Sequence, residues 1–385
     1  MYINALKAAA PKFSGCAEPY TRNGIKIIPI SQNPDEKFTQ DVFETAEGKP
    51  FAQGKHAKIF DFKDNLVIKH YINEKFAEHE IDILNKMHDF NILIPCAGRG
   101  VSAFKKKNGG IYLVSDKFNG LPLNKIKDSL DIKNLQLIME ALYQLDMPVE
   151  NPGRKEEFPF CSLMHYDLHP GNILLDGSRA GIIDFENAVF GNLFYDKDKP
   201  KKYIEDSNCY ISDIPGVKSN LREFEFNIFF NLLVKNGSID INKFAGYLRI
   251  KSGYHKKRAE FFEEKAEQYQ DKEIKQQLKT LAQKEYAHYK MLKNPKPAVI
   301  EAELAKIQAA VFAYTADASI DLIPRGIKED YVKSFVSSFK ERFQKESDRF
   351  TFNKNKKIYW NDCAELFKIW TDDADKLCAR IRERK

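Results

Sequence analysis

The 385-residue sequence predicts an α+β fold, with short strands in its first third and helices in most of the rest. Two observations predict it. Short apolar or alternating stretches, punctuated by Gly, Asn and Asp turns, run from Ile25 to about residue 114. After Gly120 the apolar residues recur mainly at helical spacing, and the last third is strongly charged. At roughly 150 residues per domain, this length corresponds to two or three units.

The composition is that of a globular protein, with 43% hydrophobic, 30% charged and 12% aromatic residues. The net charge of +6 is spread thinly, which argues against a nucleic-acid partner. No apolar run approaches the roughly 18 residues of a membrane span, and the first residues lack the architecture of a signal peptide. The six cysteines form no Cys-x-x-Cys pair, which favours ordinary packed thiols in a reduced compartment. We therefore expect a cytoplasmic protein.

The β-rich part is expected at 25–118, after an N-terminal extension at 1–24. Strands are predicted at 25–28, 59–62 and 66–70, and a hairpin pairs 101–104 with 111–114. A helix is predicted at 73–87, because Phe76, Ile81, Leu84 and Met87 fall near helical spacing behind an Asn73 cap.

The helical part is expected at 119–250, followed by a helical extension or bundle at 251–385. Asn294-Pro295-Lys296-Pro297 ends the long charged helix predicted before it. Both tryptophans, Trp360 and Trp370, lie at helical spacing and are expected in the core. The helices are predicted near 131–145, 219–235, 240–251, 255–293, 298–313, 328–346 and 361–382.

One stretch carries chemistry: it runs from His165 to Leu175 and continues at 182–186. Asp167 and Asn172 lie five residues apart on a loop, and Asp184 follows Asn172 by twelve residues, behind a second short strand. An amide oxygen and a carboxylate from separate segments can hold one or two Mg²⁺ ions, or Mn²⁺, against phosphates. The carboxylate of Asp167 beside them can orient an attacking hydroxyl.

The sequence motif at 165–172, followed by Asp184-Phe185-Glu186, resembles the catalytic and metal-binding loops of the protein-kinase-like superfamily. It is most similar to the aminoglycoside phosphotransferase and choline kinase branch, and Asp196 resembles that branch's downstream aspartate. The resemblance implies a two-lobed kinase-like fold, a small β-rich lobe and a large helical lobe, with ATP and Mg²⁺. It assigns Asp167 and His165 to the catalytic loop, where His165 is expected to brace the backbone, and it assigns Asn172 and Asp184 to the metal.

The same resemblance implies the remaining nucleotide contacts. Lys69, at the end of an apolar strand, looks like the lysine that contacts the α- and β-phosphates, and Glu80 looks like its acidic partner, with Glu78 or Glu74 as alternatives.

Gly54 looks like part of the loop over the phosphates. The backbone C=O of Asp116 and N–H of Phe118 look like the groups that meet the adenine edge, with Ser115 in the gatekeeper position.

Three functions remain open. A kinase acting on a small-molecule hydroxyl is favoured by the sequence motif at 165–172, by Asp196 and by the lack of an Ala-Pro-Glu element. The long region at 251–385 favours a divergent protein kinase of bacterial or effector type, which specialised secretion could deliver into another cell. A nucleotide-binding scaffold or a nucleotidyl transferase is the third. Residues 198–202, Asp-Lys-Pro-Lys-Lys, are expected to be a solvated loop.

Overall fold

The structure is a computed structural model of the whole chain. It describes residues 18–63, 65–89, 99–106, 109–126, 131–150, 160–192, 220–221, 223–225, 227, 240–317, 327–350 and 352–383. These residues divide into two compact units. Unit 1 comprises the described parts of Met1–Leu93, Ala97–Asn119 and Phe185–Asn187, and unit 2 comprises the rest.

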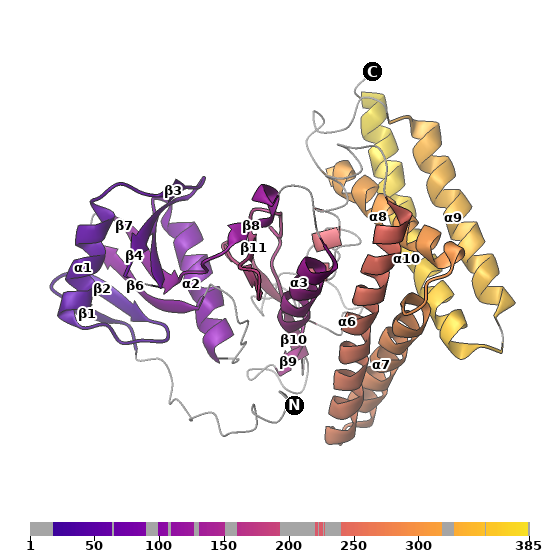
Figure 1. The fold of residues 1–385 in the computed structure, drawn as a ribbon, viewed down its shortest axis with the longest axis horizontal. Helices are drawn as coiled ribbons and strands as arrows, with labels where there is room; N and C mark the ends of the chain where they lie inside the picture. The colour runs from indigo at the N-terminus through magenta and orange to yellow at the C-terminus, as the bar shows by residue number, and fades with distance from the viewer. Residues whose placement is uncertain are drawn as a thin grey trace. The chain divides into compact units, whose positions relative to one another are not determined.

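Unit 1 is built on a seven-stranded antiparallel sheet in the order β1-β2-β6-β7-β5-β4-β3 (Figure 1). All the strands predicted from the sequence in this part are confirmed. The sheet also includes Tyr20–Arg22, which falls within the segment expected to be an extension. The strands are β1 (Tyr20–Arg22), β2 (Ile25–Pro29), β3 (Ala52–Gln53), β4 (Ala57–Phe62), β5 (Leu66–Tyr71), β6 (Gly100–Lys106) and β7 (Gly109–Asp116).

Two helices cover opposite faces of this sheet (Figure 1). Helix α1 (Glu36–Ala46) was not predicted; Asp35 caps it by accepting from the Phe38 N–H at 2.7 Å. Its Phe38 packs in one core cluster with Ile68 of β5. Helix α2 (Glu74–Asp89), predicted at 73–87, lies on the other face. Since side chains alternate along a strand, Lys69 points away from the Ile68 cluster and toward α2.

Unit 2 begins with two small three-stranded sheets around α3 (Ile132–Leu145), a predicted helix. One sheet has the order β13-β10-β9 and the other β12-β11-β8. A short 3₁₀ turn, η2, covers Leu123–Lys125. The strands are β8 (Leu121–Pro122), β9 (Val149–Glu150), β10 (Phe160–Met164), β11 (Ile173–Leu175), β12 (Ala180–Ile182) and β13 (Val189–Asn192).

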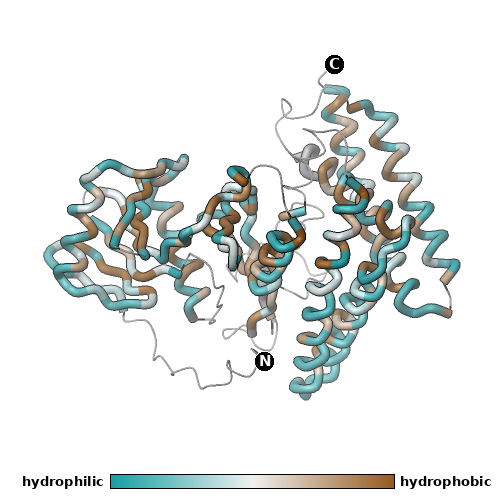
Figure 2. The backbone as a smooth tube through the Cα atoms, viewed as in Figure 1, coloured by the Kyte–Doolittle hydropathy of each residue, from teal (hydrophilic) through white to brown (hydrophobic). Residues whose placement is uncertain are grey.

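Long helices form the remainder of unit 2, namely α6 (Ile241–Gln268), α7 (Lys272–Leu292), α8 (Pro297–Asp317), α9 (Glu329–Arg349) and α10 (Lys354–Glu383). The last three confirm the predicted helices, and Trp360 and Trp370 are buried, as expected. The predicted helix boundary between 251 and 255 is wrong, because α6 runs through it. The chain breaks instead before Asp271, whose carboxylate caps α7 by accepting from Glu273 N at 2.8 Å. Figure 2 shows the hydrophilic residues that dominate α6 and α7.

The architecture is therefore mixed, with a β-rich N-terminal sheet and a helical C-terminal part, and it is compatible with a two-lobed kinase-like fold. Of the helix predicted near 219–235, the structure describes Asn220, Leu221, 223–225 and Asn227, all helical. Asp196 and residues 198–202 lie outside the described residues. Among the helices that are described, none has the length and apolar character needed to cross a membrane.

Candidate active site

The loop between β10 and β11 carries the predicted catalytic residues, and His165 at its start is fully buried. Its Nε2 lies 2.9 Å from the carbonyl oxygen of Ile183, and its Nδ1 accepts from the N–H of Asp167 at 3.3 Å. A carbonyl can only accept, so Nε2 carries the proton and the ring is neutral. Both ring nitrogens therefore contact backbone, which is the bracing arrangement expected for His165.

Asn172 and Asp184 lie at the same end of the β11–β12 hairpin, one just before β11 and the other just after β12. Ile173 pairs with Ile182, and the N–H of Ile183 donates to the Asn172 carbonyl at 3.0 Å. Asp184 follows directly, with a φ of 72°, a left-handed conformation that Asp tolerates better than most residues. The Asn172 side chain donates from Nδ2 to the carbonyl of Asp167 at 2.9 Å. Asp167, Asn172 and Asp184 thus belong to one connected loop cluster.

The donor set of this cluster suits a hard divalent cation. Because Nδ2 of Asn172 is turned to the Asp167 carbonyl, Oδ1 is the amide atom left to serve as a ligand. Amide and carboxylate oxygens are the ligands Mg²⁺ prefers, and Mg²⁺ usually keeps several waters. Within the described residues no group of three or more His, Cys, Asp or Glu could hold a metal ion.

Two residues that the sequence analysis missed hold the backbone of this loop. Glu223 accepts from Leu168 N at 2.7 Å through Oε1 and from Tyr166 N at 3.1 Å through Oε2. Asn220 accepts from His165 N at 2.8 Å. Burial raises the pKa of Glu223 to about 7; the charge of Asp167 acts in the same direction, and the two N–H donors oppose it.

The predicted lysine in unit 1 pairs with the first of its three candidate partners. Lys69 Nζ lies 2.8 Å from Oε1 and 3.1 Å from Oε2 of Glu80, which is itself buried. The Tyr71 hydroxyl also donates to Glu80, and the Phe185 N–H donates to its Oε1 at 3.2 Å. Phe185 is the residue after Asp184 in the chain.

The two alternative acids, Glu74 and Glu78, instead contact Lys105, at 2.6 and 3.1 Å. Both are largely exposed on α2. The structure therefore gives Lys69 a buried partner and leaves the other two acids on the solvated face of the helix.

Gly54 lies in the turn between β3 and β4, and its N–H donates to the Ala57 carbonyl at 2.9 Å. That N–H is therefore engaged within the turn itself.

At the end of β7, Asp116 N donates to Arg99 O at 3.0 Å, and the Asp116 carboxylate accepts from Arg99 at 2.8 Å. Phe118 and Ser115 are buried. The backbone atoms expected to contact adenine therefore lie in a short segment. It is fixed at one end by β7 and at the other by the buried ring of Phe118.

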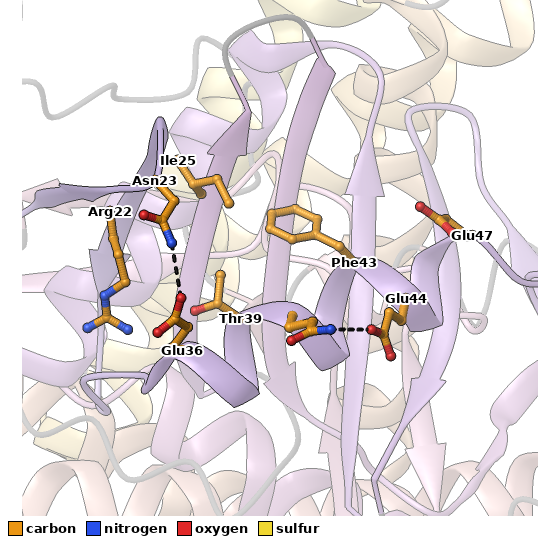
Figure 3. A pocket seen from close by; sticks show the side chains of 9 residues that line it. Arg22, Asn23, Ile25, Glu36, Thr39, Phe43, Glu44 and Glu47 are labelled. Atoms are coloured by element: carbon orange, nitrogen blue, oxygen red, sulfur yellow. Dashed lines mark hydrogen bonds between the residues drawn. The ribbon is translucent and has the colours of Figure 1, made fainter.

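A pocket of about 290 Å³ in unit 1 lies elsewhere, between the β1–β2 hairpin and α1 (Figure 3). Glu36, Glu44 and Glu47 contribute to its wall, and Glu36 accepts from Asn23 at 3.0 Å. None of the predicted site residues lines it.

Comparison with known families places a match on the loop cluster. Residues 144–196 match the phosphotransferase enzyme family, part of the protein-kinase-like superfamily. The matched segment contains His165, Asp167, Asn172 and Asp184, and it confirms the resemblance to the aminoglycoside phosphotransferase and choline kinase branch. No curated protein matches the chain. The match supports a phosphotransferase of the kinase-like superfamily.

Proposed function

We propose that this chain transfers the γ-phosphoryl group of ATP to a hydroxyl of a small molecule. One observation carries the proposal. The Asn172 side chain donates a hydrogen bond to the backbone carbonyl of Asp167, and the backbone carbonyl of Asn172 accepts one from the N–H of Ile183, the residue before Asp184. This connectivity supports two oxygen ligands and a separate carboxylate in one place, the combination that phosphoryl transfer needs.

In the proposed reaction Asp167 orients the acceptor hydroxyl and accepts its proton. The hydroxyl oxygen bonds to the γ-phosphorus while the bond to the β-phosphate oxygen breaks and ADP leaves. The transition state of phosphoryl transfer is loose, so positioning and charge account for most of the rate enhancement. Asn172 and Asp184 would hold Mg²⁺, which when bound neutralises charge on the β- and γ-phosphates. Because both its ring nitrogens contact backbone, His165 positions the loop and moves no proton.

The nucleotide is held, in this proposal, by residues of unit 1. Lys69, fixed by Glu80, contacts the α- and β-phosphates as a point charge on an immobilised stem. The turn at Gly54 covers the phosphates, and the backbone at Asp116 and Phe118 reads the adenine edge. Unit 1 would then correspond to the small lobe. Residues 119–250 would form the large lobe, and residues 251–385 would be a helical extension of it.

A second candidate is a protein kinase, favoured by the helices α7–α10, which lie outside the matched segment. The acceptor separates the two. Purified chain with Mg-ATP and a panel of choline, sugars and aminoglycosides should show acceptor-dependent ADP release. Phosphate appearing on the chain itself or on added protein, without a small acceptor, would favour the protein kinase.

The residue assignment is tested with three variants in that assay. Asp167→Ala should remove turnover and keep nucleotide binding. Asp184→Asn, chosen because Asn also tolerates a positive φ, keeps an oxygen but removes the charge of the proposed ligand, and it should lower turnover and raise the Mg²⁺ requirement strongly. Asp176→Asn, at the other end of the same β11–β12 hairpin, is the matched control and should keep near-wild-type turnover. Wild-type turnover in either of the first two variants contradicts the assignment.

A further inference from the structure

A buried chain of hydrogen bonds joins the catalytic loop to α6. It begins at His165, whose N–H donates to Asn220 Oδ1 at 2.8 Å. The Asn220 Nδ2 group donates to Leu163 O at 2.6 Å and to Asp146 Oδ1 at 2.7 Å. Every polar atom of this fully buried amide is therefore used, and the amide can adopt only one orientation.

Asp146, at the C-terminal end of α3, connects the amide to α6. Its Oδ1 also accepts from Asn220 N at 3.0 Å, and its Oδ2 accepts from Leu221 N at 3.2 Å and from the Tyr254 hydroxyl at 2.7 Å. All these partners are donors. Burial raises the pKa of Asp146, and Arg258, the Tyr254 hydroxyl and Asn220 oppose that shift. A cation stands beside it: Arg258 donates from Nη1 to the Asp146 carbonyl at 2.6 Å.

Arg258 extends the connection to the next helix. Its Nε donates to Glu285 Oε1 of α7 at 2.8 Å, and Glu285 Oε2 lies 2.6 Å from Nδ1 of His255. Tyr254 and Arg258 lie one turn apart in α6, so one face of the helix presents both groups to Asp146. Neither residue lies in the segment that matches the phosphotransferase enzyme family.

We propose that Tyr254 and Arg258 are positioning residues for phosphoryl transfer, acting through Asp146 and Asn220 on the backbone of His165 and so on Asp167. This inference rests on the proposed function for its catalytic consequence. It gives the helical region a role in the reaction: α6 fixes the start of the loop, which Glu223 fixes further along.

The alternative is that the Tyr254 bond contributes only to stability. Tyr359 supplies the matched control, because its buried hydroxyl also donates to a carboxylate, Glu303 Oε1, at 2.8 Å. Glu303 pairs with Lys251 and Lys306, and among the described residues it makes no hydrogen bond to the catalytic loop. Tyr254→Phe and Tyr359→Phe therefore delete the same kind of bond, and only the first lies on the proposed path.

The test compares these two variants with the wild type by hydrogen exchange of the 160–172 backbone and by steady-state kinetics. Tyr254→Phe should speed exchange of the 165–168 amides by about tenfold, the effect of one lost buried hydrogen bond. It should lower kcat by a similar factor and change the KM for ATP less, because Lys69 and the backbone at Asp116 and Phe118, which are proposed to contact the nucleotide directly, are not part of this hydrogen-bond path. Tyr359→Phe should leave both loop exchange and kcat near wild type.

Two further measurements decide the remaining cases. In an Asp167→Ala background, Tyr254→Phe should cause no additional loss of residual turnover, since residues that act as one unit are not additive. Asp146→Asn, which places an amide hydrogen against these donors, should reproduce the exchange phenotype. If the wild type shows no phosphoryl transfer, the proposed function fails, while the exchange data still test the path to the loop. Unchanged 165–168 exchange in both Tyr254→Phe and Asp146→Asn overturns the inference.

Discussion

The side-chain amide of Asn172 donates a hydrogen bond to the backbone carbonyl of Asp167 at 2.9 Å. One residue thereby has two proposed tasks, since its Nδ2 holds the loop and its Oδ1 is the proposed Mg²⁺ ligand. Substitutions can separate the two. Asn172→Ala removes both atoms, whereas Asn172→Asp keeps an oxygen ligand and loses only the donor.

We expect both variants to lose kcat, because both lose the bond to Asp167. Their Mg²⁺ requirements should differ. Asn172→Ala should need about tenfold more Mg²⁺ for half-maximal turnover, the effect of losing one oxygen ligand, and Asn172→Asp should stay close to wild type. The measurement is a Mg²⁺ titration of turnover at saturating acceptor. An equal shift of the Mg²⁺ requirement in the two variants would show that Asn172 is not a ligand.

The second prediction concerns the ion pair of Lys69 and Glu80. Glu80→Gln removes the carboxylate charge that pairs with the ammonium of Lys69, whose side chain is only 12% exposed. Breaking such a buried pair costs roughly 3–5 kcal/mol. We expect faster hydrogen exchange in β5 and α2 and a nucleotide Kd raised by about tenfold, because the lysine is no longer fixed.

Glu78→Gln is the control for that prediction. Glu78 lies two residues away on the same helix, contacts Lys105 instead, and has a side chain that is 59% exposed. Exposed pairs contribute about 0–1 kcal/mol, so exchange and nucleotide affinity should stay near wild type. Equal losses in the two variants would mean that the partner of Lys69 was assigned wrongly.

The sequence predicted the parts of the site that are local in the chain. Asp167, Asn172 and Asp184 lie on one loop and one short hairpin, and their spacing together with the family resemblance pointed to this stretch of the chain. Lys69 and Glu80 were predicted from the resemblance to the kinase-like superfamily, and in the structure they pair between β5 and the helix that follows it. Helix α1 was missed, although Asp35 caps it and Phe38 and Val42 lie at helical spacing.

What the sequence did not predict is the support of the loop. Glu223 lies 55 residues from Leu168, and Tyr254 lies 108 residues from Asp146. A buried acid and an exposed acid look alike in a charged helical sequence, and only packing distinguishes them. The break between α6 and α7 was missed for a related reason, since the Asp271 cap lies among many other charged residues.

The third prediction concerns acid stability and His255. The pKa of this imidazole is lowered to about 4: burial is the largest cause, His288 and Lys251 act in the same direction, and Glu285 opposes them. Glu285 stays ionised over the same range: burial would raise its pKa, but Arg258 and His255 hold it at about 2. Between pH 6.5 and 4 the unfolded chain binds a proton that the folded chain excludes, so unit 2 loses stability on acidification.

His255→Phe removes this titration and keeps a ring against His288, whose centroid lies 4.9 Å away. Relative to wild type, the variant should gain stability as the pH falls from 6.5 to 4, by on the order of 3 kcal/mol. Both tryptophans lie in α10 of unit 2, so their fluorescence in urea titrations reports the relevant unfolding. A difference from wild type that does not change with pH would contradict the assignment.

The last prediction concerns Glu223, whose titration has the opposite sign. Its pKa is raised to about 7 when folded, against 4.5 as the ordinary value. Between these values the folded state holds a proton that the unfolded state has released, so the contribution of Glu223 to stability is lost as the pH rises from 4.5 through 7. Glu223→Gln should therefore gain stability relative to wild type over that interval, by roughly 3 kcal/mol.

Ionisation of Glu223 should lower stability but raise kcat as the pH increases. Only the ionised carboxylate can accept fully from both Leu168 N and Tyr166 N, the amides on either side of Asp167. The wild-type kcat should thus rise with an apparent pKa near 7, at the pH where unit 2 becomes less stable. Glu223→Gln keeps one acceptor oxygen, and we expect a lower kcat without that inflection. A pH–rate profile measured beside the urea titrations checks the predictions for kcat and for stability.

If Glu223→Gln keeps the inflection of kcat near pH 7, another group causes it. If the stability difference between Glu223→Gln and wild type does not change with pH, Glu223 is ionised over the whole interval.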